Sequence, residues 1–157
     1  GIIGEEDNFS DTDSTVTAAL IKRFHASRND IEPLVVWGDG SPLRELTYAE
    51  DMAAAFMWCL ENYNDAQVIN VGTTEELSIK QIALIIAETM GIDPSRITFD
   101  TSKPSGVHRK STDNTRFIEA SNFKFSPTAE AIRRTTQWYV DSIGTEGTVN
   151  MKPKTIS

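Results

Sequence analysis

An aromatic side chain and an arginine stand at a spacing that could hold a phosphorylated ligand. Trp37 ends an apolar run, the turn-forming residues 38–40 (GDG) follow it, and Arg44 comes shortly afterwards. An indole face beside a guanidinium can stack a base or bind a phosphate at two points. Spacing alone favours a simpler alternative, in which Trp37 belongs to the core and Arg44 pairs with Glu45 or another surface acid.

A second group of cations lies in residues 102–110 (SKPSGVHRK). Glycine and proline permit tight turns in this segment, which could bring Lys103, Arg109 and Lys110 together around an anion. Composition alone favours a plain solvated loop. The two histidines, His25 and His108, carry the same caution, because an isolated histidine is more often exposed or hydrogen-bonded than catalytic.

Several other chemistries are excluded by residue type. Gly1 and Gly4 have the spacing of the last two glycines in a dinucleotide fingerprint, but no strand precedes them and the acidic residues 5–7 (EED) follow where a pyrophosphate would approach. No tyrosine has a lysine four residues later, and there is no Walker-type loop. The single cysteine, Cys59, can form no internal disulfide, and no Cys/His cluster offers a zinc site. A reducing, cytoplasmic setting is therefore predicted.

The net charge and the length of the apolar stretches argue against nucleic acids and membranes as partners. The chain has 157 residues and a net charge of −8, which repels a nucleic-acid backbone at long range. Its longest apolar stretch, residues 79–90, is shorter than the ~20 residues needed to cross a bilayer, and the acidic start does not read as a signal peptide. We therefore expect no nucleic-acid or membrane partner. A local basic segment on an acidic protein suits a small anionic ligand.

The elements that must position these residues alternate between helix and short strand. Apolar periodicity predicts helices over residues 14–27, 48–64 and 78–90, and a last helix that begins at Ser126-Pro127. Capping boxes are predicted at Thr47 with Glu50 and at Ser78 with Gln81, and Gly91 is placed to end the third helix. Strands are expected at residues 34–37, 44–47, 67–71 and 97–99.

This pattern predicts a mixed α/β (α+β) fold. Its strands are too few and too short for a complete Rossmann sheet, so we expect short strands with three to four helices. Residues 1–142 are predicted to form one substrate-binding domain, and residues 143–157, rich in Gly, Thr and Lys, a flexible tail. The chain reads as half of a larger architecture.

Several motifs, taken in order, resemble one known family. The chain is similar to the C-terminal half of the GDP-L-fucose synthases, epimerase/reductases of the extended short-chain dehydrogenase group, from about Gly4 to Val140. The matching segments are residues 4–9 (GEEDNF), 19–25 (ALIKRFH), 35–38 (VVWG), 44–45 (RE), 51–53 (DMA), 70–73 (NVGT), 99–104 (FDTSKP) and 109–110 (RK). A set of collinear motifs is more specific than any one of them.

The resemblance implies that cofactor binding and substrate binding belong to different halves of the protein. In that family an N-terminal Rossmann half binds NADPH and carries the Ser and Tyr-x-x-x-Lys groups, and the C-terminal half binds the GDP-sugar. It implies substrate contacts by Arg23, Trp37, Arg44 and Lys110, which favours the ligand interpretation of Trp37 and Arg44. No cofactor is expected in this chain, since NADP would come only with the N-terminal half, and the chain alone is expected to lack catalysis.

One position departs from the family pattern. The family has a histidine in a Ser-His-Val sequence as an acid/base in epimerisation, whereas this chain has Thr15 between Ser14 and Val16. A threonine hydroxyl does not titrate near neutrality and cannot replace an imidazole as proton donor and acceptor. His25 and His108 are weak substitutes because neither occupies the matching position. Epimerisation is therefore in doubt even with an N-terminal half.

A second hypothesis belongs to a different class. A half-protein would expose the apolar face that meets its Rossmann partner, and such a patch favours self-association or capture of another protein. The chain would then be a noncatalytic binding or assembly module, with a homo-oligomer formed through that face. The missing histidine slightly favours this alternative.

Overall fold

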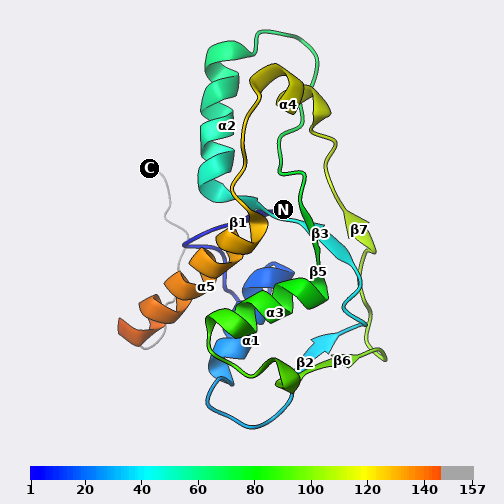
Figure 1. Ribbon diagram of the computed structural model, residues 1–157, viewed down its shortest axis with the longest axis vertical. Helices are drawn as coiled ribbons and strands as arrows, with labels where there is room; N and C mark the ends of the chain where they lie inside the picture. The colour runs from blue at the N-terminus through cyan, green and yellow to red at the C-terminus, as the bar shows by residue number, and fades with distance from the viewer. Residues whose placement is uncertain (146–157) are drawn as a thin grey trace.

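The computed structural model describes residues 1–145 and shows a mixed α/β arrangement of helices and short strands. The helices are longer than the strands, and no complete Rossmann sheet forms within the described residues, as predicted (Figure 1). In chain order the elements are β1 Ile2–Ile3, α1 Val16–Ala26, β2 Leu34–Trp37, β3 Leu43–Glu45, β4 Thr47–Tyr48, α2 Ala49–Asn62, β5 Glu76–Ser78, α3 Ile79–Thr89, a 3₁₀ turn Pro94–Arg96, β6 Ile97–Asp100, β7 Arg109–Lys110, α4 Thr115–Ser121 and α5 Thr128–Thr145.

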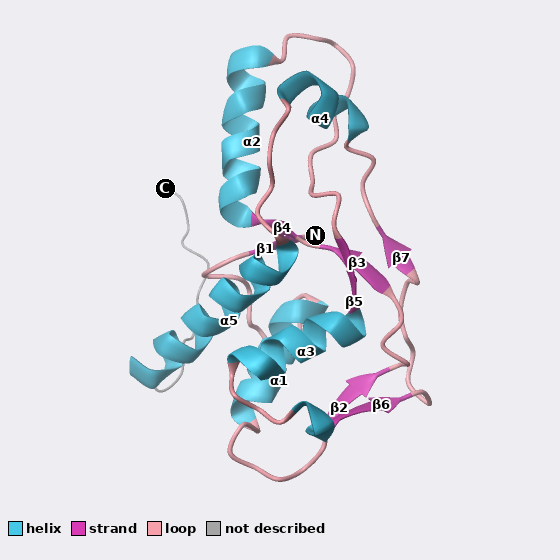
Figure 2. Ribbon diagram, in the orientation of Figure 1, coloured by secondary structure: helices cyan, strands magenta, loops and turns pink. Residues whose placement is uncertain are grey.

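The core lies between α1, α3 and α5. Apolar residues at helical spacing give each of these helices one buried stripe, and Phe24, Ile82 and Ile132 are all fully buried in it. Removing one such side chain from water contributes about 1.5–3 kcal/mol. This helical layer supports the short strands on its flank, which are too small to form a core of their own (Figure 2).

Helix α3 is fixed at both ends by local signals, as the sequence predicted. The Ser78 hydroxyl accepts a hydrogen bond from the Gln81 backbone N–H at 3.2 Å, and the Gln81 side chain accepts one from the Ser78 backbone N–H at 2.9 Å. Gly91 follows the helix with φ +67°, the left-handed conformation that ends helices. The first turn of α3 is also tied to the preceding loop, because the Lys80 backbone N–H donates to Gly40 O.

The strands form three small sheets rather than one. β2 and β6 pair in parallel, β1 and β4 pair in parallel, and the third sheet has the order β5-β3-β7, with β3–β5 antiparallel and β3–β7 parallel. The β2–β6 pair and the β3–β7 pair lie along the same side of the molecule, and the β6–β7 connection joins them (Figures 1 and 2). This connection, residues 101–108, therefore lies between the two sheets.

Helices α2 and α4 form a lobe away from the core (Figure 1). Its interior is aromatic: the Trp58 ring meets Phe117 edge-on with centroids 5.5 Å apart, and Phe117 also contacts Phe123 and Phe125. The Asp51 carboxylate joins this lobe to the start of α5 by accepting hydrogen bonds from the Ser126 N–H and hydroxyl. Sequence analysis did not anticipate α4, so the expected three to four helices become five α-helices in residues 1–145.

Two local predictions were wrong for reasons that lie outside the local sequence. The capping box at Thr47 is absent: Tyr48 precedes α2 without a side-chain cap, and the Thr47 hydroxyl accepts instead from the Thr73 N–H at 2.9 Å. Residues 67–71 do not form a strand, since no neighbouring strand in the described chain pairs with them. A β-prone sequence needs such a partner before its backbone groups can form a ladder.

The last described helix, α5, ends at Thr145, so residues 143–145 of the predicted tail lie within this helix. The rest of the predicted tail, residues 146–157, lies outside the described residues. A search of the described helices found none with the length and apolar character of a transmembrane span.

Candidate functional site

Trp37 lies at the end of β2 with its indole in solvent. Along β2 the side chains alternate, so that Leu34 and Val36 are buried while Val35 and Trp37 face outward, and Trp37 is 59% exposed. The alternative that Trp37 belongs to the core is therefore wrong. The Lys103 ammonium lies 6.0 Å from the centre of its ring, and Arg23 of α1 donates a hydrogen bond to Val35 O. The exposed face of β2 thus combines an aromatic plane with two nearby cations.

The turn after Trp37 brings the β6–β7 connection close to it. Gly38 has φ +81°, and a Cβ at this position would lie 2.5 Å from the Ser105 hydroxyl oxygen. Only glycine permits both this backbone conformation and this close approach. The next residue in the connection, Gly106, lies beside Arg44, because a Cβ there would be 3.7 Å from Arg44 Nη2. The connection therefore links Trp37 to Arg44.

Arg44 and Lys110 are neighbours across the parallel β3–β7 ladder. They are Cα partners in register, so their side chains leave the sheet on the same face. Arg44 Nη1 donates to Leu43 O at 2.7 Å and to Val107 O at 2.8 Å, which fixes the guanidinium against the β6–β7 connection. The alternative, in which Arg44 pairs with Glu45 or another surface acid, is not seen among the described residues, because the guanidinium donates to these two backbone oxygens. Two cations on adjacent strands suit a ligand with two phosphates.

The neighbouring Arg109 is held by an acidic residue. Its Nε and Nη2 each donate to the Glu76 carboxylate at 2.8 Å, a two-point pair that reaches from β7 across β3 to β5. The hydrogen bonds from Arg109 hold the pKa of Glu76 below its usual value, and those same bonds raise the pKa of Arg109. Of the three cations that this segment could have brought together, Arg109 is therefore paired with Glu76, and Lys103 and Lys110 are exposed.

A pocket of about 330 Å³ opens beside β7. It is lined by Gly1, Glu45, Arg109, Lys110, Ser111 and Thr112. Its one acidic side chain, Glu45, is 4% exposed and accepts a hydrogen bond from the Thr112 N–H at 2.5 Å. The volume is at the lower end of the range for small-molecule sites. The pocket lining thus holds the cations Arg109 and Lys110 together with the buried Glu45 carboxylate.

The four predicted site residues lie in two pairs. Arg23 and Trp37 belong to the β2 side, Arg44 and Lys110 to the β3–β7 side, and the connection 101–108 runs between the pairs. Lys103 is the residue that the predicted set missed. Its place in the basic segment was visible in the sequence, but its position over the Trp37 ring depends on the β2–β6 register.

The histidines and Thr15 have structural roles. Thr15 is the N-cap of α1, where its hydroxyl accepts from the Ala18 N–H at 3.3 Å. His25 is 8% exposed and meets the Tyr139 ring edge-on at 5.4 Å, and burial, with a smaller contribution from Arg28, lowers its pKa. His108 is exposed on the β6–β7 connection. Of the two candidate substitutes for the family histidine, only His108 is open to solvent.

The turn between β1 and α1 does not fit a dinucleotide. Glu5, Glu6 and Asp7 occupy the position where a pyrophosphate would approach the helix. Glu6 adopts a left-handed backbone conformation, φ +62°, and burial raises the pKa of Asp7, one of whose carboxylate oxygens is buried without a hydrogen bond. Carboxylates repel phosphates, so these residues do not form a seat for NADP.

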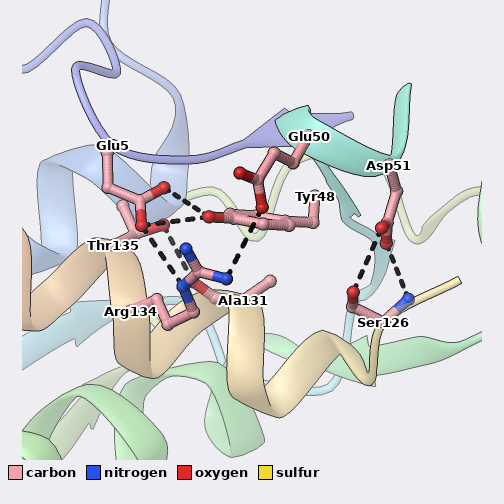
Figure 3. Close-up of polar contacts among 8 residues, drawn as sticks. All are labelled: Glu5, Tyr48, Glu50, Asp51, Ser126, Ala131, Arg134 and Thr135. Atoms are coloured by element: carbon pink, nitrogen blue, oxygen red, sulfur yellow. Dashed lines mark hydrogen bonds and ion pairs between the residues drawn. The ribbon is translucent and has the colours of Figure 1, made fainter. Parts of the chain in front are cut away.

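This acidic turn is instead tied to the helices (Figure 3). The Tyr48 hydroxyl lies 2.7 and 3.0 Å from the two carboxylate oxygens of Glu5. Arg134 of α5 stacks over the Tyr48 ring at 4.7 Å and forms ion pairs with Glu5 at 3.3 Å and Glu50 at 3.6 Å. We call these four residues the Tyr48 cluster. It joins the acidic turn to the start of α2 and to α5.

Comparison with known proteins identifies relatives. Residues 2–72 match the NAD dependent epimerase/dehydratase family. The chain is 36% identical over 143 residues to a probable GDP-L-fucose synthase 1 of Oryza sativa subsp. japonica, an alignment that covers 90% of this chain and 43% of the relative. It is 34% identical over 151 residues to the GDP-L-fucose synthase of Escherichia coli strain K12, covering 90% and 47% respectively.

Solved structures of related proteins resemble this chain as well. A GDP-L-fucose synthetase from Naegleria fowleri bound to NADP superposes with a TM-score of 0.84 at 30% identity, covering 92% of this chain and 46% of that one. A Thermotoga maritima UDP-glucose 4-epimerase, at 19% identity and a TM-score of 0.75, shares the fold. The chain spans less than half the length of these relatives. The resemblance predicted from the motifs is therefore confirmed over nine-tenths of the chain.

Proposed function

We propose, on the premise that this chain is a relative of the GDP-L-fucose synthases, that it holds a GDP-sugar through Trp37, Arg44, Lys110 and Arg23. The observation that carries the proposal is the in-register pair Arg44 and Lys110, which is joined to the exposed Trp37 by one connection. Two adjacent cations match a diphosphate, and an exposed indole can stack a base. The net charge of −8 makes a small anion a better match than a nucleic acid.

The same proposal assigns no hydride transfer to these residues by themselves. Reduction needs a nicotinamide placed against the sugar, and the acidic β1–α1 turn offers no seat for the dinucleotide within residues 1–145. In a protein that also carried a Rossmann half, NADPH would supply the hydride. The residues described here would then orient the sugar nucleotide, and Thr15, whose hydroxyl does not titrate near neutrality, would not act as an acid/base.

Calorimetric titration with GDP tests the binding proposal. Trp37→Ala, Arg44→Gln and Lys110→Gln should each weaken GDP binding by about ten-fold, the size expected for losing a stacking or charge-assisted contact. The matched control is Arg133→Gln, because Arg133 is an exposed arginine of α5 that pairs only weakly with Glu130 at 3.7 Å. Absence of heat from a folded wild-type chain, or equal losses in control and site variants, would reject the proposal.

A second candidate function is that of an assembly module, which the outer face of α2 favours. Phe56 and Met57 are each 55% exposed and Leu60 is 80% exposed on this helix. The charged residues of α2 are all acidic, so two copies packed face to face would bring like charges together. A partner with an apolar surface and a basic rim fits better than a second copy.

Light scattering separates the two kinds of partner for this face. The assembly proposal in its heterologous form expects a monomer at micromolar concentration. A dimer that Leu60→Lys dissociates would instead establish self-association through α2. Failure of GDP binding together with a dimer that Leu60→Lys dissociates would make assembly the better account of the chain, whereas a monomer that binds no GDP would support neither function.

A further inference from the structure

We infer that Glu76 is a positioning residue for the anion site, acting through Arg109 on Lys110. This inference rests on the proposed function, since it names a residue that prepares the same site. Glu76 is on β5 and Arg109 on β7, and the two strands are separated by β3. Their pairing therefore spans the whole sheet.

Because side chains alternate between the two faces of a strand, the Glu76–Arg109 pair also decides on which face Lys110 lies. Arg109 and Lys110 are consecutive in β7, so their side chains leave the sheet on opposite faces. The register places Arg109 opposite Leu43 and Lys110 opposite Arg44. Glu45 and Glu76 are partners in the β3–β5 ladder, on the face that carries Arg109. Holding Arg109 on this face leaves Lys110 on the other, beside Arg44.

Apart from that hold, β7 and its flanks are fixed by the Leu43 N–H on His108 O, by Arg44 Nη1 on Val107 O and by the Thr112 N–H on the Glu45 carboxylate. None of these contacts holds the Arg109 side chain. The strand is two residues long, both its residues are exposed, and it follows a connection without regular structure. A slip of one residue would exchange the faces of Arg109 and Lys110. The two-point geometry at 2.8 Å opposes such a slip, because a bidentate pair defines orientation as well as distance. The Glu76 side chain is 20% exposed and the Arg109 side chain 60%, so the pair is shielded mainly on its acidic side.

The direction in which Glu76→Gln changes GDP affinity distinguishes a positioning role from a purely electrostatic one. Glu76→Gln removes a negative charge from the sheet that carries Arg44 and Lys110, so long-range electrostatics alone predicts tighter GDP binding. Positioning predicts weaker binding, because the released β7 no longer keeps Lys110 beside Arg44. We expect a loss of about five-fold, in line with the loss of one well-formed ion pair. Glu88→Gln, which removes an exposed carboxylate at the far end of α3, is the matched control and should change binding by less than about two-fold.

A ligand-free measurement keeps this test independent of the proposed function. The Leu43 N–H donates to His108 O at 2.8 Å, one rung between β3 and the start of β7. Glu76→Gln should accelerate hydrogen exchange of this amide while the Ile82 and Ile86 amides of α3 stay protected. The double variant Glu76→Arg with Arg109→Glu should recover protection and part of the GDP affinity.

The outcomes are distinct. Faster Leu43 exchange together with weaker GDP binding supports the positioning role. Unchanged exchange, or GDP binding that tightens or stays within two-fold, overturns it. If the wild-type chain binds no GDP, the proposed function fails, and the exchange rate of Leu43 alone decides whether Glu76 fixes β7.

Discussion

Replacing Tyr48 by phenylalanine removes one hydroxyl from the Tyr48 cluster and little else. Tyr48 is 4% exposed, and its hydroxyl is 2.7 and 3.0 Å from the oxygens of Glu5. A hydrogen bond to a charged group contributes about 1.5–3 kcal/mol. Because Arg134 still pairs with Glu5 and still stacks on the ring of the variant, we expect the lower part of that range, about 1.5 kcal/mol of lost stability.

The assay is urea unfolding at pH 7, followed by far-UV circular dichroism, for wild type and Tyr48→Phe. Tyr139→Phe provides the matched control, because Tyr139 is also buried, at 6% exposure, and its main contacts are aromatic. The control should lose less than about 0.5 kcal/mol. A Tyr48→Phe variant as stable as wild type would show that the cluster does not hold the acidic turn.

The same cluster makes a prediction at alkaline pH. Burial, followed by the hydrogen bond to Glu5 and its negative charge, raises the pKa of Tyr48 from 10 to about 12. The folded phenol keeps its proton where the unfolded one loses it, so this contribution is complete below pH 10 and is lost as the pH rises through about 12. The shift corresponds to about 3 kcal/mol at most. Wild type should therefore lose more stability than Tyr48→Phe over this range.

Three further changes test other parts of the fold. Ser78→Ala removes the capping box of α3 and should cost about 1 kcal/mol in urea unfolding, whereas an unchanged midpoint would show that tertiary packing alone fixes the start of α3. Gly40→Ala places a Cβ against the Phe99 ring at φ +78° and should lower the melting temperature by several degrees, about 1–3 kcal/mol; a variant that melts with wild type would disprove the required close approach. Burial, then Arg28, lowers the pKa of His25, so its stabilising effect is present above its unfolded value of 6.5 and declines as the pH falls. Wild type should lose more stability than His25→Gln between pH 7.5 and 5.5, and parallel losses would contradict a buried neutral imidazole.

Local sequence was enough to predict the elements whose stabilising contacts are close in sequence. Helix α3 is the clearest case, because its cap, apolar stripe and terminal glycine all lie within residues 78–91. The strand at β2 was predicted from a four-residue β-prone run. The family resemblance, read from collinear motifs, was confirmed by relatives that cover nine-tenths of the chain. The assignment of the four ligand-contacting residues remains a prediction.

The tertiary structure decided where those elements meet. The exposure of Trp37 depends on the β2–β6 register, and the pairing of Arg109 with Glu76 joins residues 33 positions apart. Residues 67–71 have the sequence of a strand but no partner strand in the described chain. The Thr47 hydroxyl accepts a hydrogen bond from the Thr73 N–H and does not cap α2. Periodicity indicates which face of a segment is apolar. Only the folded chain determines which distant segment packs on that face or pairs with the backbone of that segment. For that reason the sequence indicated which cations could bind a ligand, and the fold determined that Arg109 is held by Glu76 while Lys103 and Lys110 face solvent.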